Sequence, residues 1–357
     1  MPAESLRIKL DNQYYGGWID IGLRRSIEVL CGNFQLGLTD KWEGDEFDMA
    51  PGTPLSVYAG EDLLITGYLN ETSIDIDAQQ KQVKSTGRCR TQDLVDCSTV
   101  LPKSTWSKVS LYDLCKQVCD PFGIKVIVEA QNLGEDIRDL TLNEGDSPFE
   151  LIRRVCADRA VLPISNVEGN LVLTTGGKIR THDAFVYGQN VLKAQARVSD
   201  TERFSEYTIQ GSQTSGGGGW GTKVSTSVDI KGKAEDPYVK RYRPKIISLN
   251  QITSYKLAKA RASWEAQVQF GKSVDVSLSV VGWRQSNGDL WRENLLVPVD
   301  LPPLKIFKTD MIISEINYIQ NDSDGTQAHI TLKRPEIYAA EPTQVVKKKK
   351  RGNMSWG

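Results

Sequence analysis

Apolar and polar residues alternate in short runs along the first hundred positions of the chain. The runs LRIKL, GWIDIGL, PLSVYAG and LLITGYLN are rich in Ile, Val, Leu and Tyr, and such alternation is typical of half-buried strands. Glycine and proline pairs at 16–17 and 51–52 separate the runs. Short strands at this spacing predict a small barrel or sandwich, which we assign to a β-barrel domain over residues 1–97.

The apolar spacing changes to that of helices between residues 98 and 180. Two helices are predicted, each with a serine N-cap and an acidic residue three positions later: Ser110 with Asp113, and Ser147 with Glu150. A strand at 124–128 and a hairpin that turns at 168–169 accompany them. The pattern therefore predicts an α/β domain of two helix–strand repeats over 98–180.

Strand patterns return over residues 181–340 and are interrupted by one long helix. In that helix apolar residues recur at roughly helical spacing, and Gly271 is expected to end it. NDSDG at 321–325 resembles a calcium loop, but its glycine stands too early and no glutamate closes it, so a β-turn is favoured. We predict a second β-barrel domain with one long helix here. The apolar helix positions are Ile252, Leu257, Ala260, Trp264 and Val268.

A short internal echo links the two β regions. EDLLITGYL at 61–69 and TDMIISEIN at 309–317 share an acidic residue, a run of large aliphatic residues, and then Thr66 or Ser314. Each segment precedes the final strand of its region. The echo suggests that one barrel was duplicated.

The glycine-rich stretch SQTSGGGGWGTK (212–223) has two readings, a phosphate-binding loop or a mobile loop. A phosphate loop needs Gly-Lys-Ser/Thr opening a helix, whereas here Thr222 precedes Lys223 and a strand pattern follows. The mobile reading is favoured, with Trp220 as an anchor for a partner protein. The expected partner-binding residues are Gly216, Gly217, Gly218, Gly219 and Trp220.

Few residues in the chain are suited to catalysis or to metal binding. Cys115 and Cys119 lie one helical turn apart, but two histidines far away in sequence leave a metal site short of ligands, so buried thiols are favoured. His182 precedes Asp183 without a nucleophile motif, so a Ser-His-Asp site is not expected. We predict no catalytic residue, no metal and no cofactor.

Composition describes a soluble globular protein with an uneven charge. Of its 357 residues 39% are hydrophobic and 25% charged, with a net charge of −1. No apolar run approaches the ~18 residues of a membrane span and no signal-peptide core is present, so we expect synthesis in the cytoplasm without membrane insertion. The body is mildly acidic, which argues against a dedicated nucleic-acid surface.

The last 17 residues (341–357) carry five basic side chains and one acidic one, against 39 basic and 44 acidic elsewhere. The first reading of this tail is a solvated, flexible segment. The second is an electrostatic handle for acidic groups of a partner or for DNA phosphates. The partner-binding residues of this second reading are Lys347, Lys348, Lys349, Lys350 and Arg351.

Nearly the whole chain resembles the baseplate hub proteins of Mu-like contractile-tailed phages. The resemblance lies in the order and spacing of IGLRRSIEVLCGNFQL, SPFELIRRVCADRAVLPISNVEGNLVLT, ERFSEYTIQG, ARASWEAQVQFGKSVDVSLSVVGWRQSNGDLWRENLLVPV and HITLKRPEIY. It implies a mainly β fold with an α/β insert and a structural protein without enzyme activity. It further implies a ring-forming homotrimer in the virion tail baseplate, assembled in the host cytoplasm. Its two barrels per subunit would join the sixfold tail tube to the threefold spike, with DNA passing through.

Two other classes of function stay open at this point. A carbohydrate- or peptidoglycan-binding β-module would use exposed aromatic platforms, for which Trp18, Trp106, Trp283 and Trp291 are candidates, although tryptophans in β cores are commoner. A glycosidase would use paired carboxylates such as Asp45 and Glu46, although a solvated acidic loop is favoured at 43–48.

Overall fold

The computed structural model describes residues 6–10, 13–16, 20–39, 50–76, 81–157, 159, 161–214, 227–249, 254–339 and 341–342. The chain is mainly β and divides into two compact units. The first unit comprises residues 1–199 and 271–340, and the second comprises 200–270 and 341–357. Each unit has a hydrophobic core of its own, and the first contains two. The four-part division proposed from the sequence stays a prediction.

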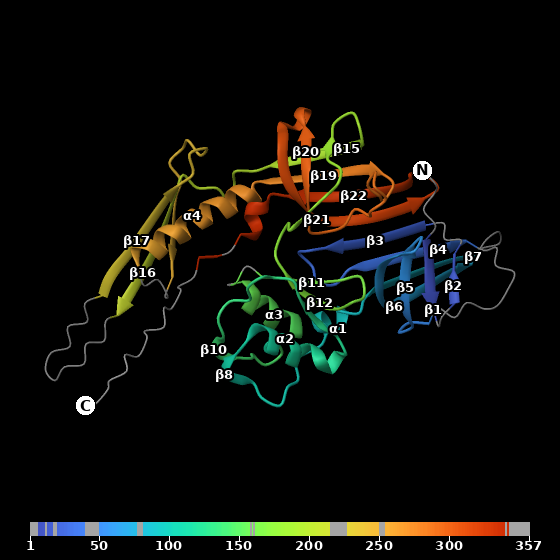
Figure 1. Ribbon diagram of the computed structural model, residues 1–357, viewed down its shortest axis with the longest axis horizontal. Helices are drawn as coiled ribbons and strands as arrows, with labels where there is room; N and C mark the ends of the chain where they lie inside the picture. The colour runs from blue at the N-terminus through green and yellow to red at the C-terminus, as the bar shows by residue number, and fades with distance from the viewer. Residues whose placement is uncertain are drawn as a thin grey trace, which may run out of the picture. The chain divides into compact units, whose positions relative to one another are not determined.

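The first unit is built on one large sheet, which joins strands from both ends of the chain. Along its main path the strand order is β15-β19-β22-β21-β3-β4-β7-β6-β5-β1-β2, and β20 pairs with β21. In Figure 1 the blue strands and the orange strands meet where β3 lies beside β21. The strands from the amino-terminal part are β1 (Leu6–Leu10), β2 (Gln13–Tyr15), β3 (Asp20–Ser26), β4 (Asn33–Thr39), β5 (Pro54–Ala59), β6 (Asp62–Ile76) and β7 (Lys81–Cys89). From the carboxyl-terminal part come β13 (Ile179–Arg180), β14 (Phe185–Val186), β15 (Val191–Val198), β19 (Val274–Val281), β20 (Leu295–Leu301), β21 (Ile306–Asn321) and β22 (Gly325–Lys333).

Five of these strands occur twice in the same order. The first repeat is β3-β4-β7-β6-β5 and the second is β15-β19-β22-β21-β20, with antiparallel pairing throughout. The long strand of each repeat also carries a bulge. Asn70 is the extra residue in β6, and Ser314 is the extra residue in β21. The two β regions are thus copies of one five-stranded arrangement.

The structure modifies two expectations about these repeats. In the described residues neither repeat closes into a barrel, because both belong to one open sheet. The inward-facing residues of both repeats contribute to one shared core. The duplication suggested by the echo is present in the strand order, but its register was wrong by four residues. The bulges align Asn70 with Ser314, whereas the echo aligned Thr66 with Ser314.

An α/β domain lies between the two repeats in the chain and has a separate core. Both capping predictions are confirmed. Ser110 accepts a hydrogen bond from the Asp113 backbone, and Ser147 and Glu150 exchange two such bonds. The 168–169 turn is present as well. The elements are α1 (Gln92–Asp96), β8 (Thr105–Val109), α2 (Leu111–Cys119), a 3₁₀ turn (Asp120–Phe122), β9 (Val126–Val128), β10 (Ile137–Thr141), α3 (Pro148–Ala157), β11 (Leu162–Ser165) and β12 (Leu171–Thr174).

The second unit packs one long helix against a small sheet. The helix is α4 (Tyr255–Lys272), and the sheet contains β16 (Glu206–Thr214), β17 (Ser227–Glu235) and β18 (Pro244–Ser248). Ala258, Ala262 and Ala266 are buried against this sheet. The predicted apolar face was partly wrong, because Ala260 is exposed. Small residues every fourth position let the helix lie close to β17, where a Cβ on Gly232 would be 2.2 Å from the Ala258 carbonyl carbon.

Gly271 does not end α4, contrary to the prediction. The helix continues to Lys272. A larger residue at position 271 is excluded for a different reason, which is the close packing of a neighbouring segment. A Cβ at this position would lie 2.9 Å from Cγ1 of Ile337, a residue of the 3₁₀ turn Pro335–Tyr338. Another such turn, Pro302–Leu304, connects β20 to β21.

Candidate functional site

The sheet of the first unit has one buried face and one polar face. Alternate residues of each strand enter the core, as Ile21 and Leu23 of β3 do, and the residues between them face away from it. The polar face extends across both repeats without interruption. Residues on it include Arg24, Gln35, Thr86, Lys193, Gln195, Ser277, Ser279, Asn317 and His329.

Two shallow troughs lie on this polar face, one in each repeat. The trough of about 500 Å³ is lined by residues of β3, β4 and β7, and the trough of about 370 Å³ by residues of β15, β19 and β22. These strands are counterparts in the duplicated arrangement. Asn317 of β21 borders both troughs, and beside it Arg24 forms a 2.6 Å ion pair with Glu315. The face can present mixed polar and charged groups along its whole length.

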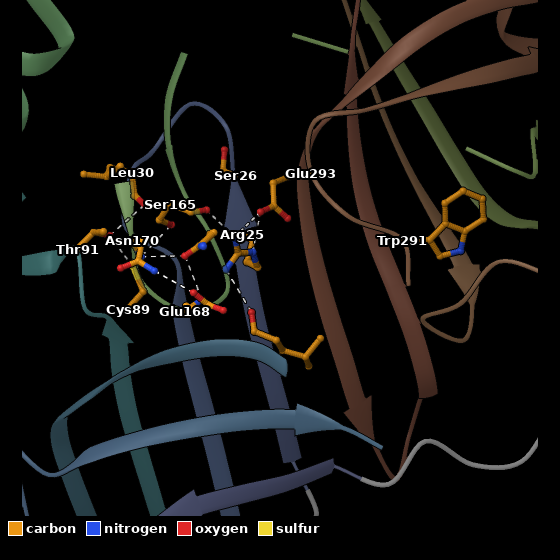
Figure 2. A network of polar contacts seen from close by, with 12 residues as sticks. Arg25, Ser26, Leu30, Cys89, Thr91, Ser165, Glu168, Asn170, Trp291 and Glu293 are labelled. Atoms are coloured by element: carbon orange, nitrogen blue, oxygen red, sulfur yellow. Dashed lines mark hydrogen bonds and ion pairs between the residues drawn. The ribbon is translucent and has the colours of Figure 1, made fainter. Parts of the chain in front are cut away.

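A buried polar junction joins the two repeats to the α/β domain. Arg25 of β3 is 5% exposed, and its guanidinium forms an ion pair with Glu293, which precedes β20. The same guanidinium donates hydrogen bonds to the carbonyl oxygens of Leu64 in β6 (3.2 Å) and Ser165 in β11 (2.7 Å). Figure 2 shows Arg25 reaching toward Glu293 on one side and Ser165 on the other. One side chain therefore ties three parts of the unit together.

The charges of this junction stabilise each other. Burial alone would lower the pKa of Arg25, but the charge of Glu293 and the hydrogen bond to it outweigh burial, so the pKa of Arg25 is raised. Arg284 makes a second link between the repeats, with a 2.6 Å ion pair to Asp62 and a hydrogen bond to the Ala59 carbonyl. Such contacts hold the repeats in a fixed relative position, but they offer no reactive group.

Five of the six cysteines pack in or against the hydrophobic cores, and Cys97 is exposed. Cys115, Cys119 and Cys156 are buried in the core of the α/β domain. The Sγ atoms of Cys31 and Cys89 lie 3.4 Å apart, and the hydrogen bond between them lowers the pKa of Cys89 to about 6, although burial opposes this. Among the described residues no group of three His, Cys, Asp or Glu side chains is arranged to hold a metal ion.

His182 and Asp183 do not form a catalytic triad with a serine. Ser286 is the serine at this place, and its hydroxyl donates to Asp183 (2.6 Å) rather than to the histidine. A nucleophilic serine must instead bond to the base that removes its proton. Partial burial favours the neutral form of Asp183, but the hydrogen bonds from Ser286 outweigh it and lower the pKa of Asp183.

The tryptophans proposed as sugar platforms are buried where the structure describes them. Trp106, Trp283 and Trp291 are at most 3% exposed. The Trp283 indole donates to the carbonyl oxygens of Ile319 and Gln327 at the end of the second repeat. These side chains therefore stabilise cores, and Trp18 lies outside the described residues.

Sequence reasoning missed the sites that the structure brings together. The proposed partner-binding residues, Gly216–Trp220 and Lys347–Arg351, lie outside the described residues, as do Asp45 and Glu46. No sequence motif marks Arg25, because its partner Glu293 is 268 positions away. The one sequence feature that points to this site is an arginine at an inward-facing position of a predicted strand.

Within the described part of the chain, no helix has both the length and the apolar character needed to cross a membrane.

Three family models match separate parts of the chain. Residues 5–89 match the amino-terminal domain of GpP-like Mu phage baseplate assembly proteins. Residues 91–175 match the second domain of gp44-like baseplate hub proteins, and residues 254–341 match the fourth domain of the Mu phage baseplate assembly protein GpP. Together these matches include the first β region, the α/β domain and the carboxyl-terminal part of the second β region, whereas residues 176–253 lie outside them.

Known proteins resemble the chain over almost its whole length. The baseplate hub protein gp44 of Escherichia phage Mu is 30% identical, with 99% of this chain and 94% of that protein aligned. A 43 kDa tail protein of prophage MuSo2 from Shewanella oneidensis is 32% identical, with a TM-score of 0.81 over 95% of this chain and 100% of that one. A tail protein from Neisseria meningitidis, at 17% identity, has the same fold, with a TM-score of 0.77 over 95% and 99% of the two chains. The chain therefore belongs to the family of Mu-like phage baseplate hub proteins.

Proposed function

We propose that three copies of this chain form a closed ring at the centre of the baseplate, where they join the sixfold tail tube to the threefold spike. The relatives are structural tail and baseplate proteins, which supports a location in the virion tail. Assembly would take place in the host cytoplasm before the tail is complete. The ring would act by its shape and symmetry, and no catalytic step is assigned to it.

The duplicated strand arrangement is the observation that carries this proposal. Each chain contains two copies of the same five-stranded repeat, held side by side by β3 and β21. A threefold ring of such chains presents six repeats. One face of the ring could then match six tube subunits while the chains themselves keep the threefold symmetry of the spike. Two barrels per subunit, the form implied by the family resemblance, would require pairing beyond that of the described residues.

The polar face of the sheet suits the wall of a channel for DNA. Its side chains combine both signs of charge with amides and hydroxyls, for example Arg24, Glu315 and Asn317. A mixed face of this kind holds no dense basic cluster, so it would let a polyanion pass without strong binding. In the proposed ring this face lines the opening, and contact with DNA is transient.

Partner proteins would bind outside the sheet. The α/β domain and the second unit are available for contacts with neighbouring baseplate proteins. Gly216–Trp220 and Lys347–Arg351 remain proposed partner-binding segments. A sugar-binding role gains no support, because Trp106, Trp283 and Trp291 are buried.

The experiment that tests this function is the mass of the full-length chain in solution, combined with imaging of assembled tails. Light scattering at micromolar concentration should give a trimer, and averaged end views of particles should give a threefold ring at the base of the tube. A dimer in solution, or a peripheral position of the labelled protein in the particle, would contradict the proposal. Hydrolysis of cell-wall material by the purified chain would contradict its structural role.

A further inference from the structure

Two cysteine thiols lie in contact at the place where the first repeat meets the α/β domain. Cys31 belongs to the connection between β3 and β4, and Cys89 is the last residue of β7. Their Sγ atoms are 3.4 Å apart, although the residues are separated by 58 positions in the chain. Cys31 directly follows Leu30, which is buried in the core of the α/β domain, whereas Cys89 is buried in the core of the large sheet. The two thiols therefore lie between two separate cores.

The backbone around the two thiols holds them at this distance. The N–H of Cys89 donates a 3.0 Å hydrogen bond to the carbonyl oxygen of Gly32. Beside it Asn33 of β4 pairs with Arg88 of β7. A disulfide bond is about 2.0 Å long, so the two sulfur atoms have to approach each other by about 1.4 Å. An approach of this size needs rotation of the side chains rather than separation of the strands.

The two thiols differ in their access to solvent. Cys31 is partly exposed and comes shortly after the exposed residues Glu28 and Val29, whereas Cys89 is 0% exposed. Figure 2 shows Cys89 beside Thr91, whose hydroxyl oxygen lies 2.7 Å from the Cys89 sulfur. A reagent in solution can therefore reach the sulfur of Cys31, while the sulfur of Cys89 can be reached only from within the protein.

The surroundings of Cys89 favour its thiolate form. The hydrogen bond with Cys31 lowers the pKa of Cys89 against the effect of burial, and hydrogen bonding to Thr91 and the positive charge of Arg25 lower it further. The same hydrogen bond, together with burial, raises the pKa of Cys31. Only the thiolate form of a cysteine attacks a disulfide bond. Cys89 is thus suited to attack a disulfide that has formed on the neighbouring Cys31.

We propose that Cys31 and Cys89 are a dithiol site that small-molecule disulfides oxidise to an intramolecular disulfide bond. Cys31 is the residue that reacts with the reagent, and Cys89 is the residue that completes the bond. The site is reduced in a compartment rich in thiols and oxidised where small disulfides prevail. The bond fastens the connection before β4 to the end of β7, directly before the α/β domain begins.

The reaction consists of two thiol–disulfide exchanges. In the first, the proton shared by the two thiols lies on Cys89, and the Cys31 thiolate attacks one sulfur of the reagent. This step forms a mixed disulfide on Cys31 and releases one small thiol. In the second, the Cys89 thiolate attacks the Cys31 sulfur, forms the bond between the two cysteines and releases the other half of the reagent. The two cysteines are oxidised, the reagent is reduced to two thiols, and the two cysteine protons pass to those thiols.

The first test measures the mass of the full-length chain after incubation with oxidised glutathione. It uses a Cys97→Ser background, because Cys97 is exposed and would itself take up glutathione. The folded chain should lose two hydrogen atoms and retain no glutathione. Peptides mapped without reduction should show Cys31 joined to Cys89, while Cys115 and Cys156, at most 1% exposed, stay free. A chain that keeps all its thiols, or that joins a different pair, would overturn the proposal.

The second test separates the roles of the two cysteines. Cys89→Ser removes the residue that completes the bond, so the reaction should stop with one glutathione on Cys31. Cys31→Ser leaves Cys89 buried, and glutathione should modify it roughly tenfold more slowly or not at all. The reverse pattern, or equal modification of both variants, would overturn the order of the two steps. Far-ultraviolet circular dichroism checks that each variant is folded, and the first test does not depend on either variant.

The third test measures what the bond does to the fold. A bond between positions this far apart restricts the unfolded chain, so oxidation should raise the Tm of the first unit by roughly 5 °C. Dithiothreitol should reverse the shift, and Cys31→Ser should show none. An unchanged or lower Tm after complete oxidation would contradict the fastening role. These outcomes do not depend on the proposed ring, because a dimer in solution would overturn the ring and leave the dithiol site unaffected.

Discussion

The guanidinium of Arg25 and the carboxylate of Glu293 form an ion pair of 2.5 Å between side chains that are 5% and 9% exposed. The two residues belong to different repeats, and Arg25 also bonds to the carbonyl oxygen of Ser165 in the α/β domain. A buried charge of this kind is stable only while its counter-charge is present, because water cannot reach the site to solvate it. The junction should therefore control the stability of the whole first unit.

Replacement of Arg25 by Met should lower the free energy of unfolding by about 3–5 kcal/mol, since it leaves the Glu293 carboxylate buried without a counter-charge. Denaturant unfolding measures the effect. The matched control is Arg24→Met, which removes an ion pair from the neighbouring, half-exposed arginine and should change stability by at most about 1 kcal/mol. The double variant Arg25→Met/Glu293→Leu should be less destabilised than Arg25→Met. Equal losses for Arg24→Met and Arg25→Met would contradict this role.

Substitution of Ser286 by Ala should change how stability depends on pH. Hydrogen bonds from Ser286 lower the pKa of Asp183 against the effect of partial burial. A carboxyl with a lowered pKa adds stability above its ordinary pKa and loses it as pH falls through the lowered value. The free energies of unfolding of wild type and Ser286→Ala should therefore differ most near neutral pH and become equal in strong acid. Unfolding midpoints measured from pH 7 down to pH 2 test this, and a gap that widens on acidification would contradict it.

Local features of this fold could be predicted from the sequence, because their residues are neighbours in the chain. Ser147 and Glu150 cap one helix through bonds that span three positions, and Gly169 adopts the positive φ that a tight turn favours. The predicted strands of the β regions likewise follow from alternation within a few residues. These elements were confirmed where the structure describes them.

Features that depend on distant residues could not be predicted in this way. Gly271 looked like a helix stop, but Ile337, 66 positions later, is the reason for its size. The echo between the β regions was aligned four residues out of register, because a bulge is a property of pairing and leaves no mark in composition. The antiparallel pairing of β3 with β21 joins opposite ends of the chain, so it leaves no local signal in the sequence.

The close approach of α4 to β17 predicts a severe effect of a single methyl group. In Gly232→Ala the new Cβ would lie 2.2 Å from backbone atoms of Ala258 and Lys259, which cannot move independently of the helix. We expect the second unit to lose about 1–3 kcal/mol of stability, seen as faster hydrogen exchange in β16 and β17. Gly22→Ala is the control, because a Cβ there meets no atom within 4 Å. Unchanged exchange in Gly232→Ala would show that the helix can shift away.

Removal of the carboxyl-terminal residues after Val346 tests whether the basic tail binds a partner. The deleted segment contains Lys347–Arg351, and exposed contacts of this kind are worth at most about 1 kcal/mol each, so only the cluster in three copies would have a measurable effect. We expect the full-length chain to retain the spike protein in a pull-down at low salt and to release it as salt rises, because the attraction is screened. The truncated chain should bind weakly at both salt concentrations. A variant with Lys347–Lys350 changed to Gln keeps the length of the tail and should behave like the truncation if charge is the cause. Equal binding and equal infectivity of all three proteins would show that the tail is a solvated segment without a partner. Loss of the trimer on truncation would instead show that these residues pack within the ring.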